Sequence, residues 1–173
     1  FLETGPAYFD YMVNALFHEL PTVLCKIIGV YRIGYYQKGK LTKQDVIIMD
    51  NLFYDRKVDR TYDLKGSDRN RYQKEMGAVL LDENLLKSMY AGSPPLITRQ
   101  LSKGILTTSI HNDTLFLSKL NVMDYSLLVG VDEQNKELIV GIIDYVRQYT
   151  WDKHLETWVK SAGIISSKGK VPT

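Results

Sequence analysis

The sequence has little of several features that mark particular protein classes. It contains one cysteine, Cys25, so it has no disulfide framework, and the apolar run around it favours a buried thiol in a reducing compartment. No apolar run approaches the roughly 18 residues that cross a bilayer, and the first residues lack the pattern of a signal peptide. The three histidines show no ligand spacing with one another or with Cys25, so we expect no zinc site.

The chain also lacks a strong charge of either sign. Its 22 basic and 20 acidic residues give a formal net charge of +2, and its tyrosines do not alternate with Lys and Arg as in nucleic-acid-binding modules. We therefore expect no nucleic-acid partner. What the chain does contain is 45% hydrophobic residues in a length of 173, enough to bury an ordinary core in one domain or two small lobes.

The order of predicted elements indicates an α+β fold with antiparallel sheets and packed helices. An amphipathic helix begins after Thr4, and two β-rich runs follow at residues 23–36 and 45–54, joined by a mobile polar tip. The helix residues expected to face the core are Tyr8, Phe9, Met12, Val13, Leu16 and Phe17.

The second half of the chain continues this mixed order. A short strand ends at Gly66, a helix begins with Asp82 as its cap, and residues 98–120 read as two helical pieces, the second capped by Asn112. A second hairpin spans residues 125–146. A closing helix begins near Thr150, and the residues expected to face the core are Trp151, Leu155, Trp158 and Val159.

Two aspartates flank the second hairpin. Asp124 stands just before its first strand and Asp144 at the end of its second strand, so antiparallel pairing should bring both carboxylates to one edge of the sheet. Phosphoryl transfer needs such a pair, because one carboxylate orients the attacking hydroxyl while another holds the Mg²⁺ that bridges nucleotide phosphates. The alternative is structural: Asp124 caps a turn and Asp144 pairs with Arg147.

A basic cluster in the string YDLKGSDRNR suggests an anionic ligand. Lys65 stands beside a glycine and a serine, with Arg69 and Arg71 close behind, so the segment offers an ammonium, guanidinium groups and free backbone amides to a phosphate. The alternative is that Lys65 is a solvated strand end and that the arginines are ordinary loop charges.

Three strings, in this order, resemble the phosphatidylinositol phosphate kinase family: YDLKGS with an arginine six residues after its lysine, MDYSLLVG, and IIDY. The flanking strings GVYRIGY, DNLFYDRK, GSDRNR and DYVRQYTWDKHLE are similar to its PIKfyve-type branch, the phosphatidylinositol 3-phosphate 5-kinases. The resemblance implies a SAICAR synthase-like, protein-kinase-related fold. Residues 1–53 would be the remnant of an N-terminal lobe ending at the hinge, and residues 54–173 a C-terminal catalytic lobe that stops before the activation loop.

The resemblance also implies roles for individual residues. Asp124 would be the catalytic aspartate and Asp144 the magnesium ligand, while Lys65 and Arg71 would face the substrate phosphates. Apolar neighbours are expected to exclude water from both aspartates. The adenine contacts implied are the backbone of the hinge MDNLF and two aliphatic side chains: Asn51, Leu52, Leu128 and Ile143.

These roles imply an ATP- and Mg²⁺-dependent lipid kinase that phosphorylates the 5-hydroxyl of phosphatidylinositol 3-phosphate in membranes. We expect a cytoplasmic enzyme, peripheral on endosomal or vacuolar membranes, whose scaffold or regulatory partners bind outside this segment. A noncatalytic phosphoinositide-binding module with the same fold is the alternative.

The resemblance places the family's Gly-rich loop and ATP-phosphate lysine upstream of residue 1. We therefore expect little or no phosphorylation of phosphatidylinositol 3-phosphate by residues 1–173 alone, because half of the ATP phosphate clamp would be missing. A lipid kinase assay measures this directly, and robust product formation would contradict the expectation.

Overall fold

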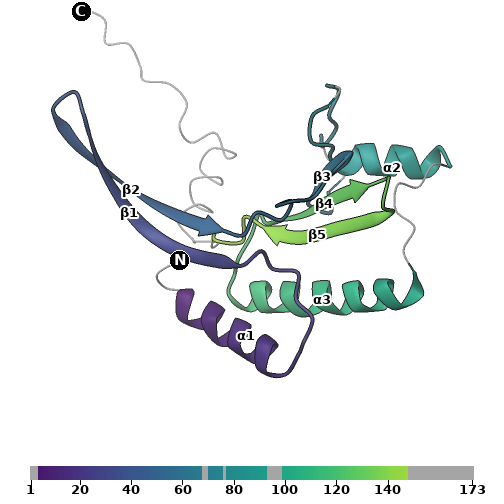
Figure 1. Ribbon diagram of the computed structural model, residues 1–173, viewed down its shortest axis with the longest axis horizontal. Helices are drawn as coiled ribbons and strands as arrows, with labels where there is room; N and C mark the ends of the chain where they lie inside the picture. Colours follow the sequence, from purple (N-terminus) through teal and green to yellow (C-terminus); the bar gives the residue numbers. More distant parts are fainter. Residues whose placement is uncertain (1–3, 68–69, 76, 93–98, 148–173) are drawn as a thin grey trace, which may run out of the picture.

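The computed structural model describes residues 4–67, 70–75, 77–92 and 99–147. Within these ranges three helices and five strands follow one another in mixed order, and both sheets are antiparallel (Figure 1). The mixed α and β content with antiparallel sheets confirms the expected class. The predicted closing helix near Thr150 lies outside the described residues.

The second hairpin forms the centre of the larger sheet. Strand β4 (Ser126–Asp132) pairs with β5 (Glu137–Ile143) on one side and with β3 (Arg60–Leu64) on the other. Because side chains alternate across a sheet, Leu127 and its partner Ile142 lie on one face, whereas Leu128 and its partner Gly141 lie on the other.

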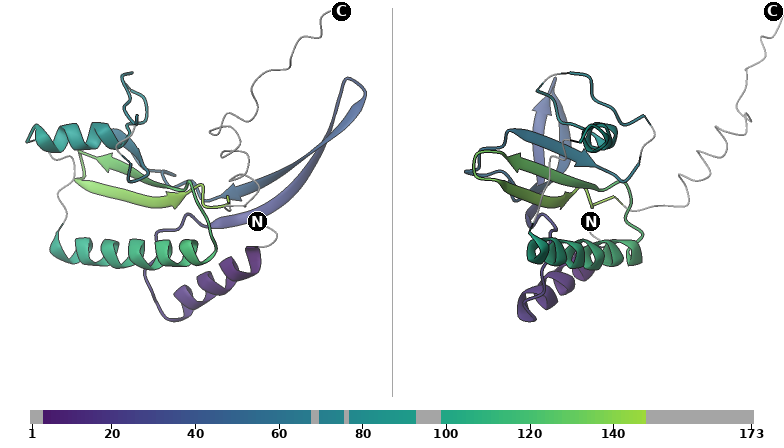
Figure 2. Two further views of the ribbon diagram at one scale, coloured as in Figure 1. Left: turned by 180° about the vertical axis from the view of Figure 1, so that it is seen from behind. Right: turned by 90° about the vertical axis from the view of Figure 1, so that its right-hand side faces the viewer.

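Side chains of helices α2 (Asp82–Tyr90) and α3 (Gln100–Lys119) approach the side of the sheet that carries Leu127 and Ile142, with α3 below the sheet in both views of Figure 2. Leu85 of α2 packs against the buried cluster of β3 and β4, and Leu117 of α3 packs in the same buried cluster as Ile142. The hydrophobic core therefore lies between this sheet face and the helices.

Helix α3 is one unbroken helix, so the predicted division into two pieces, with Asn112 as a cap, is wrong. The division rested on Asn112, because asparagine is favoured at helix N-caps. Here the hydroxyls of Thr107, Ser109 and Thr114 each donate to the carbonyl four residues earlier, which satisfies them inside the helix.

Helix α1 (Gly5–Phe17) begins after Thr4, as predicted, with a proline in its first turn. Its contact with the core is narrower than predicted, because α1 lies beside α3 and touches it along one stripe: Tyr8, Tyr11, Met12 and Ala15. Four residues expected in the core are instead exposed: Phe9, Val13, Leu16 and Phe17.

Strands β1 (Ile27–Gln37) and β2 (Lys40–Met49) form a two-stranded ribbon that extends away from the rest of the molecule (Figures 1 and 2). Only Lys38 and Gly39 connect the strands, and their φ angles of 51° and 76° are those that a two-residue hairpin turn requires. The predicted polar tip over residues 37–44 is thus a tight turn flanked by regular strand.

A buried carboxylate joins α3 to the chain that enters the ribbon. Asp113, 0% exposed, accepts hydrogen bonds from the Tyr11 hydroxyl at 2.6 Å, the Thr22 hydroxyl at 2.7 Å and the Val23 N–H at 2.7 Å. The Val23 carbonyl in turn accepts the N–H of Ile142 in β5 at 2.6 Å. Asp113 therefore fixes the segment that borders the larger sheet.

Replacement of Asp113 by alanine should lower the free energy of unfolding by about 3 kcal/mol, because buried donors that lose a charged acceptor each cost roughly 1–3 kcal/mol. Chemical denaturation measures the loss. The control is Asp10→Ala on the exposed side of α1, expected to change stability by less than about 0.5 kcal/mol. A loss for Asp113→Ala no larger than that of the control would contradict the structural role assigned to this carboxylate.

Candidate functional site

The β4–β5 hairpin brings two aspartates to one end of the sheet. Beyond the last paired residues of β4 and β5, the Met123 N–H donates to the carbonyl of Arg147 at 3.0 Å. The segment before β4 and the segment after β5 therefore stay side by side past the strand ends. Asp124 lies in the first of these two segments and Asp144 in the second. The structure thus brings them to the common edge that the hairpin pattern predicted.

Both aspartates have the same unusual backbone conformation. Their φ angle is 62° in each case, in the left-handed region that few residues other than glycine adopt. Aspartate tolerates this region better than most residues, because its short polar side chain can satisfy nearby groups. The chain turns at Asp124 before entering β4 and at Asp144 on leaving β5, so both carboxylates stand outside the buried ladder.

The expectation that apolar neighbours exclude water from these carboxylates is wrong. The side chain of Asp124 is 50% exposed, and Asp144 is also exposed. The apolar residues that follow Asp124 belong to β4 and pack into the sheet, where they cannot surround a group that lies beyond the strand end. A reaction at this edge would need bound substrates to exclude water.

Two basic side chains approach Asp124. The Nζ of Lys65 donates to the Asp124 backbone carbonyl at 2.9 Å, and Nη1 of Arg147 lies 3.4 Å from the Asp124 carboxylate. The structural alternative paired Arg147 with Asp144, but its guanidinium contacts Asp124 instead. The side chains of Arg147 and Asp124 are 59% and 50% exposed, so this ion pair contributes about 0–1 kcal/mol to stability. A bound ligand could therefore replace either partner readily.

The backbone N–H groups of the turn at residues 65–67 donate hydrogen bonds to a carboxylate of the protein itself. Asp82, 8% exposed, accepts the N–H groups of Lys65, Gly66 and Ser67 at 3.1, 2.8 and 3.3 Å. The sequence suggested that these amides are free to bind a phosphate, and that interpretation is wrong for all three. Phosphate recognition at this turn would therefore depend on side chains.

Asp82 was also expected to cap its helix, and this prediction is wrong. The N-cap residue is Leu81, and Asp82 is the first residue of α2. The Leu81 N–H is satisfied by the side-chain oxygen of Asn84 at 3.1 Å, which leaves the Asp82 carboxylate available for the turn. An acid at a helix start is typical of a cap, so the local sequence gives no sign of these partners 15–17 residues away.

Arg71 is held by the same carboxylate. Its Nε donates to Asp82 at 2.5 Å, and its Nη2 donates to the Asp63 carboxylate at 3.0 Å and to the Asp63 carbonyl at 2.7 Å. The Arg71 side chain is only 20% exposed. Its guanidinium thus ties β3 to α2, whereas Lys65 reaches the edge where Asp124 lies.

Opposing effects set the pKa of Asp82. Burial alone raises this pKa, but the hydrogen bonds from Arg71 and from the amides of Gly66 and Lys65 outweigh burial and hold it below the ordinary aspartate value. The carboxylate is therefore charged in the folded protein at neutral pH, and it holds the turn that presents Lys65.

The segment MDNLF, residues 49–53, covers the sheet face opposite α2 and α3. A Cβ added at Gly141 would come within 3.0 Å of the Leu52 side chain, so Leu52 lies directly over that glycine. Leu128 is the cross-strand partner of Gly141, and Ile143 lies two residues after Gly141 in β5. Leu128 and Ile143 therefore share this face of the sheet. The structure therefore brings Leu52, Leu128 and Ile143 to one side of the sheet.

Asn51 shapes the turn of this segment. Its side-chain oxygen accepts the Phe53 N–H at 3.1 Å, and its carbonyl accepts the Tyr54 N–H at 3.0 Å. Phe53 then lies over Gly130, where a Cβ would come within 2.5 Å of the ring. The glycines of β4 and β5 allow residues 49–53 to approach the sheet this closely.

A cavity of about 780 Å³ lies on the other face, between α2, α3 and the sheet. Its apolar lining includes Leu64, Leu85, Leu86, Ile110, Leu127 and Ile142, and it extends to the turn at Lys65. Because Leu128 and Ile143 lie on the opposite face, this cavity is separate from the side chains expected to contact adenine.

The sequence that forms this edge is similar to known proteins. The sequence profile of a family described as Phosphatidylinositol-4-phosphate 5-Kinase matches residues 1–139. The chain belongs to this phosphatidylinositol-4-phosphate 5-kinase family. The match includes Lys65, Arg71 and Asp124, and it confirms the resemblance drawn from the YDLKGS and MDYSLLVG strings.

Relatives within the kinase family resemble the whole chain. It is 52% identical to the 1-phosphatidylinositol 3-phosphate 5-kinase of Homo sapiens, 48% to 1-phosphatidylinositol 3-phosphate 5-kinase FAB1 of Saccharomyces cerevisiae and 49% to 1-phosphatidylinositol-3-phosphate 5-kinase FAB1B of Arabidopsis thaliana, over 100% of its length each time. The chain spans 8%, 8% and 10% of these three relatives, respectively.

The contacts of Asp82 predict a pH dependence of stability. Because its folded pKa lies below the unfolded value near 4, its contribution is fully present above about pH 4 and is lost as the pH falls through the folded pKa. The difference in unfolding free energy between wild type and Asp82→Asn should therefore shrink as the pH falls from about 6 to about 3. Urea denaturation at each pH measures this difference.

A matched control for the Asp82 series is Asp55→Asn, since Asp55 is exposed. Its difference from wild type should stay within about 0.5 kcal/mol across the same range. If the Asp82→Asn difference proved independent of pH, the charge of this carboxylate would not be what holds the turn.

Proposed function

We propose that this chain is a catalytic segment of a phosphoinositide kinase that transfers the γ-phosphate of ATP to the 5-hydroxyl of phosphatidylinositol 3-phosphate. The observation that carries the proposal is the common sheet edge that holds Asp124 and Asp144, with the Lys65 ammonium 2.9 Å from the Asp124 carbonyl. The relatives named phosphatidylinositol 3-phosphate 5-kinases support the choice of lipid.

We further propose a SAICAR synthase-like, protein-kinase-related fold with a hinge at residues 49–53, between an N-terminal lobe up to residue 53 and a C-terminal lobe from residue 54. The ribbon β1–β2, which extends away from the larger sheet and leads into the hinge, supports this division. Helix α1 packs against α3, so the ribbon is the part of residues 4–53 that stands apart.

In the proposed reaction Asp124 accepts a hydrogen bond from the inositol 5-hydroxyl and then takes its proton. The hydroxyl oxygen forms a bond to the γ-phosphorus while the bond from that phosphorus to the ADP oxygen breaks. Lys65 would offset the charge of the lipid phosphate as a point cation. Arg71 would support this contact by holding the turn of Lys65. If Arg71 also contacts the phosphate directly, it would do so in addition to its hydrogen bonds to Asp63 and Asp82.

The donor set at this edge fits Mg²⁺ bound together with a nucleotide. The described residues contain no cluster of three or more His, Cys, Asp or Glu side chains, and Mg²⁺ commonly takes one or two carboxylates with phosphates and water. Asp144, exposed beside the end of β5, is the carboxylate that would hold it. Bound there, Mg²⁺ would supply positive charge that offsets the negative charge developing on the transferred phosphate.

The adenine ring would lie beside the hinge, against the sheet face that carries Leu128 and Ile143. Leu52, packed over Gly141, borders the same face, so aliphatic side chains from three segments converge there. Hydrogen bonds to the base would come from the backbone at Asn51 and Leu52. An apolar surface with a few backbone donors and acceptors suits a planar heterocycle.

The proposed substrate is a membrane lipid, and we propose that the enzyme works as a peripheral protein on endosomal or vacuolar membranes, with scaffold proteins binding elsewhere on the polypeptide. No helix in the described ranges has both the length and the apolarity needed to span a bilayer.

The full-length enzyme provides the test of this proposal. Asp124→Asn should lower kcat by about 10³-fold with little change in ATP affinity, because the residue acts on the acceptor hydroxyl. Asp144→Asn should lower kcat and also raise the Mg²⁺ concentration required for nucleotide binding. Transfer of radiolabelled phosphate and titration with a fluorescent nucleotide measure the two effects.

Asp55→Asn is a control for both variants, since Asp55 is also exposed and has a left-handed φ of 54°. It should retain wild-type turnover and Mg²⁺ dependence. Identical defects in the two test variants would contradict the division of roles, and unchanged turnover in Asp124→Asn would favour a noncatalytic phosphoinositide-binding module.

A further inference from the structure

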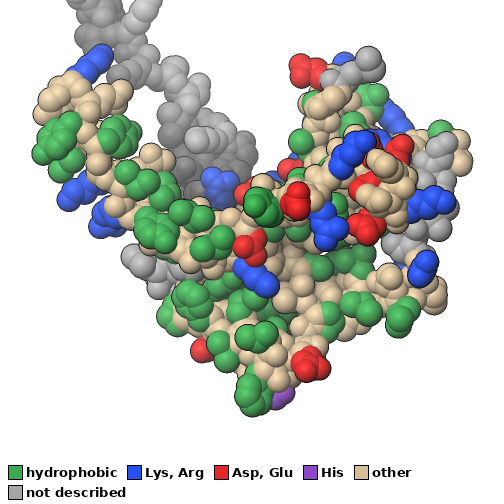
Figure 3. All heavy atoms as spheres, viewed as in Figure 1, with side chains coloured by type: hydrophobic (Ala, Val, Ile, Leu, Met, Phe, Trp, Pro, Cys, Tyr) green, Lys and Arg blue, Asp and Glu red, His purple; other side chains and the backbone are tan. Residues whose placement is uncertain are grey.

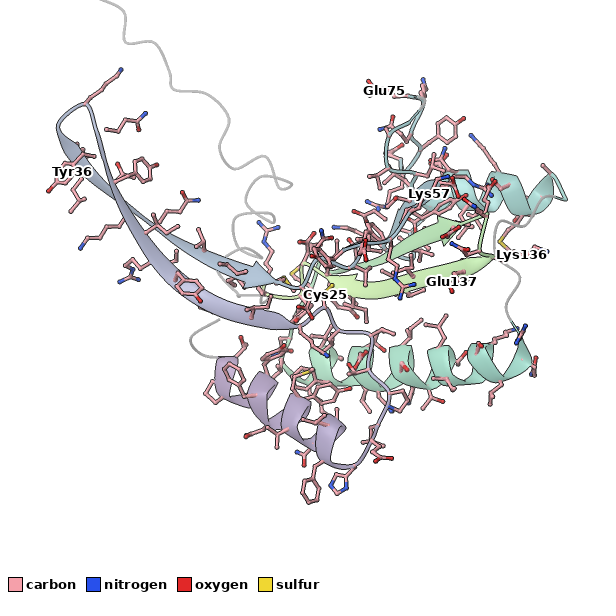
Figure 4. All side chains as sticks on the ribbon, in the orientation of Figure 1. Cys25, Tyr36, Lys57, Glu75, Lys136 and Glu137 are labelled. Carbon is pink, nitrogen blue, oxygen red and sulfur yellow. The ribbon has the colours of Figure 1, made fainter. Side chains whose placement is uncertain are left out.

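The outer end of the β1–β2 ribbon exposes apolar side chains far from the sheet. Figure 4 shows Tyr36 near this end and Cys25 where the ribbon joins the larger sheet. Tyr36 and Leu41 are cross-strand partners with exposed fractions of 78% and 45%. Leu41 also lies beside Gly34, since a Cβ added at Gly34 would be 3.6 Å from the Cδ1 of Leu41. Residues 36–43 are called the hairpin tip below.

The charge of the hairpin tip has one sign. Lys38, Lys40 and Lys43 are all exposed, and no acidic residue lies between Arg32 and Asp45. Those two residues neutralise each other through a bidentate ion pair at 2.6 and 2.8 Å. Figure 3 shows hydrophobic and basic side chains on the visible face of the outer ribbon, with no acidic ones among them.

We propose that the hairpin tip docks on an anionic lipid bilayer. Tyr36 and Leu41 would enter the interface, where the amphipathic ring of tyrosine is favoured, and the three lysines would face the anionic headgroups. The inference rests on the proposed function, in which the substrate is a membrane lipid. It adds the surface of this chain that meets the membrane.

The exposed face of α1 shows that apolar exposure alone does not select a membrane. Phe9, Val13, Leu16 and Phe17 are also exposed, but the first 25 residues contain no Lys or Arg. An anionic surface attracts basic residues, so it has no electrostatic attraction for this face of α1. At the hairpin tip, by contrast, exposed Tyr36 and Leu41 lie beside three exposed lysines, with no acidic residue between Arg32 and Asp45.

The two-residue turn gives the docking surface a defined shape. Positive φ angles at Lys38 and Gly39 close the turn in register, so the Tyr36–Leu41 pair and the lysines keep fixed relative positions. Strand β2 then runs directly into the hinge segment at residues 49–53. A docked tip would therefore orient the catalytic edge relative to the bilayer that carries its substrate.

Photocrosslinking of the full-length polypeptide tests where lipid makes contact. The photoreactive residue benzoylphenylalanine replaces Tyr36, and the protein is irradiated with vesicles of phosphatidylcholine and phosphatidylserine that lack phosphoinositides. We expect covalent phosphatidylserine adducts at position 36. The control replaces Tyr90, which is 87% exposed at the end of α2 and should form no such adducts.

Protein adducts alone at position 36 would overturn the proposal, because they would mean that the tip is covered by another part of the polypeptide or by a partner. Equal lipid labelling at positions 36 and 90 would also overturn it, since contact with the bilayer would then not depend on the tip.

Partitioning onto the same vesicles measures the contribution of charge. Each lysine near an anionic surface contributes about fivefold to binding, so the triple variant Lys38→Ser/Lys40→Ser/Lys43→Ser should bind roughly 100-fold more weakly. The charge-matched control, Lys103→Ser/Lys119→Ser/Lys136→Ser, removes three exposed lysines elsewhere and should lose less than about threefold. An equal loss in both triples would overturn the proposal.

Turnover of a short-chain, water-soluble phosphatidylinositol 3-phosphate separates docking from chemistry. The triple tip variant should retain the wild-type kcat on this substrate, and a loss there would overturn the assignment of the tip to membrane docking. Adducts and partitioning are measured without turnover. A failure of the docking proposal and a failure of the proposed kinase activity would therefore give different results.

Discussion

The antiparallel pairing of β4 with β5 is the constraint on which the rest of the site depends. It sets Asp124 and Asp144, at the two ends of one hairpin, at one sheet edge, and the Met123–Arg147 hydrogen bond keeps the two segments together there. Pairing also decides the two faces of the sheet. One face packs against α2 and α3, and the other, where β4 and β5 carry glycines, packs against residues 49–53.

Buried and exposed acids have separate tasks in this chain. Asp82 and Asp113 are almost completely buried, and each accepts hydrogen bonds from three or more groups on segments distant in sequence. Their charge is satisfied by the protein, so they hold the Lys65 turn and the border of the sheet. Asp124 and Asp144 remain exposed at the edge, where a metal ion or an acceptor hydroxyl can reach them.

Element type and order were predictable because hydrophobic periodicity is local. The second hairpin and the helix after Thr4 appear where their patterns placed them, and the first hairpin also forms, although its second strand is Lys40–Met49 and not residues 45–54. The errors arose where a partner lies elsewhere in the chain. Asn112 resembles a cap although α3 continues through it, and Phe9 and Leu16 have the spacing of core residues although α1 presents only one stripe to α3.

The sequence by itself determined the family, through the motifs around Lys65, Asp124 and Asp144, and it determined that the two aspartates lie at one sheet edge, because one hairpin joins them. Only the tertiary structure decided that Asp82 fills the backbone amides beside Lys65, that Arg71 binds protein carboxylates and that the aspartates lie in water. The physical reason is that hydrogen-bond partners and burial depend on segments brought together by folding, which no local pattern encodes.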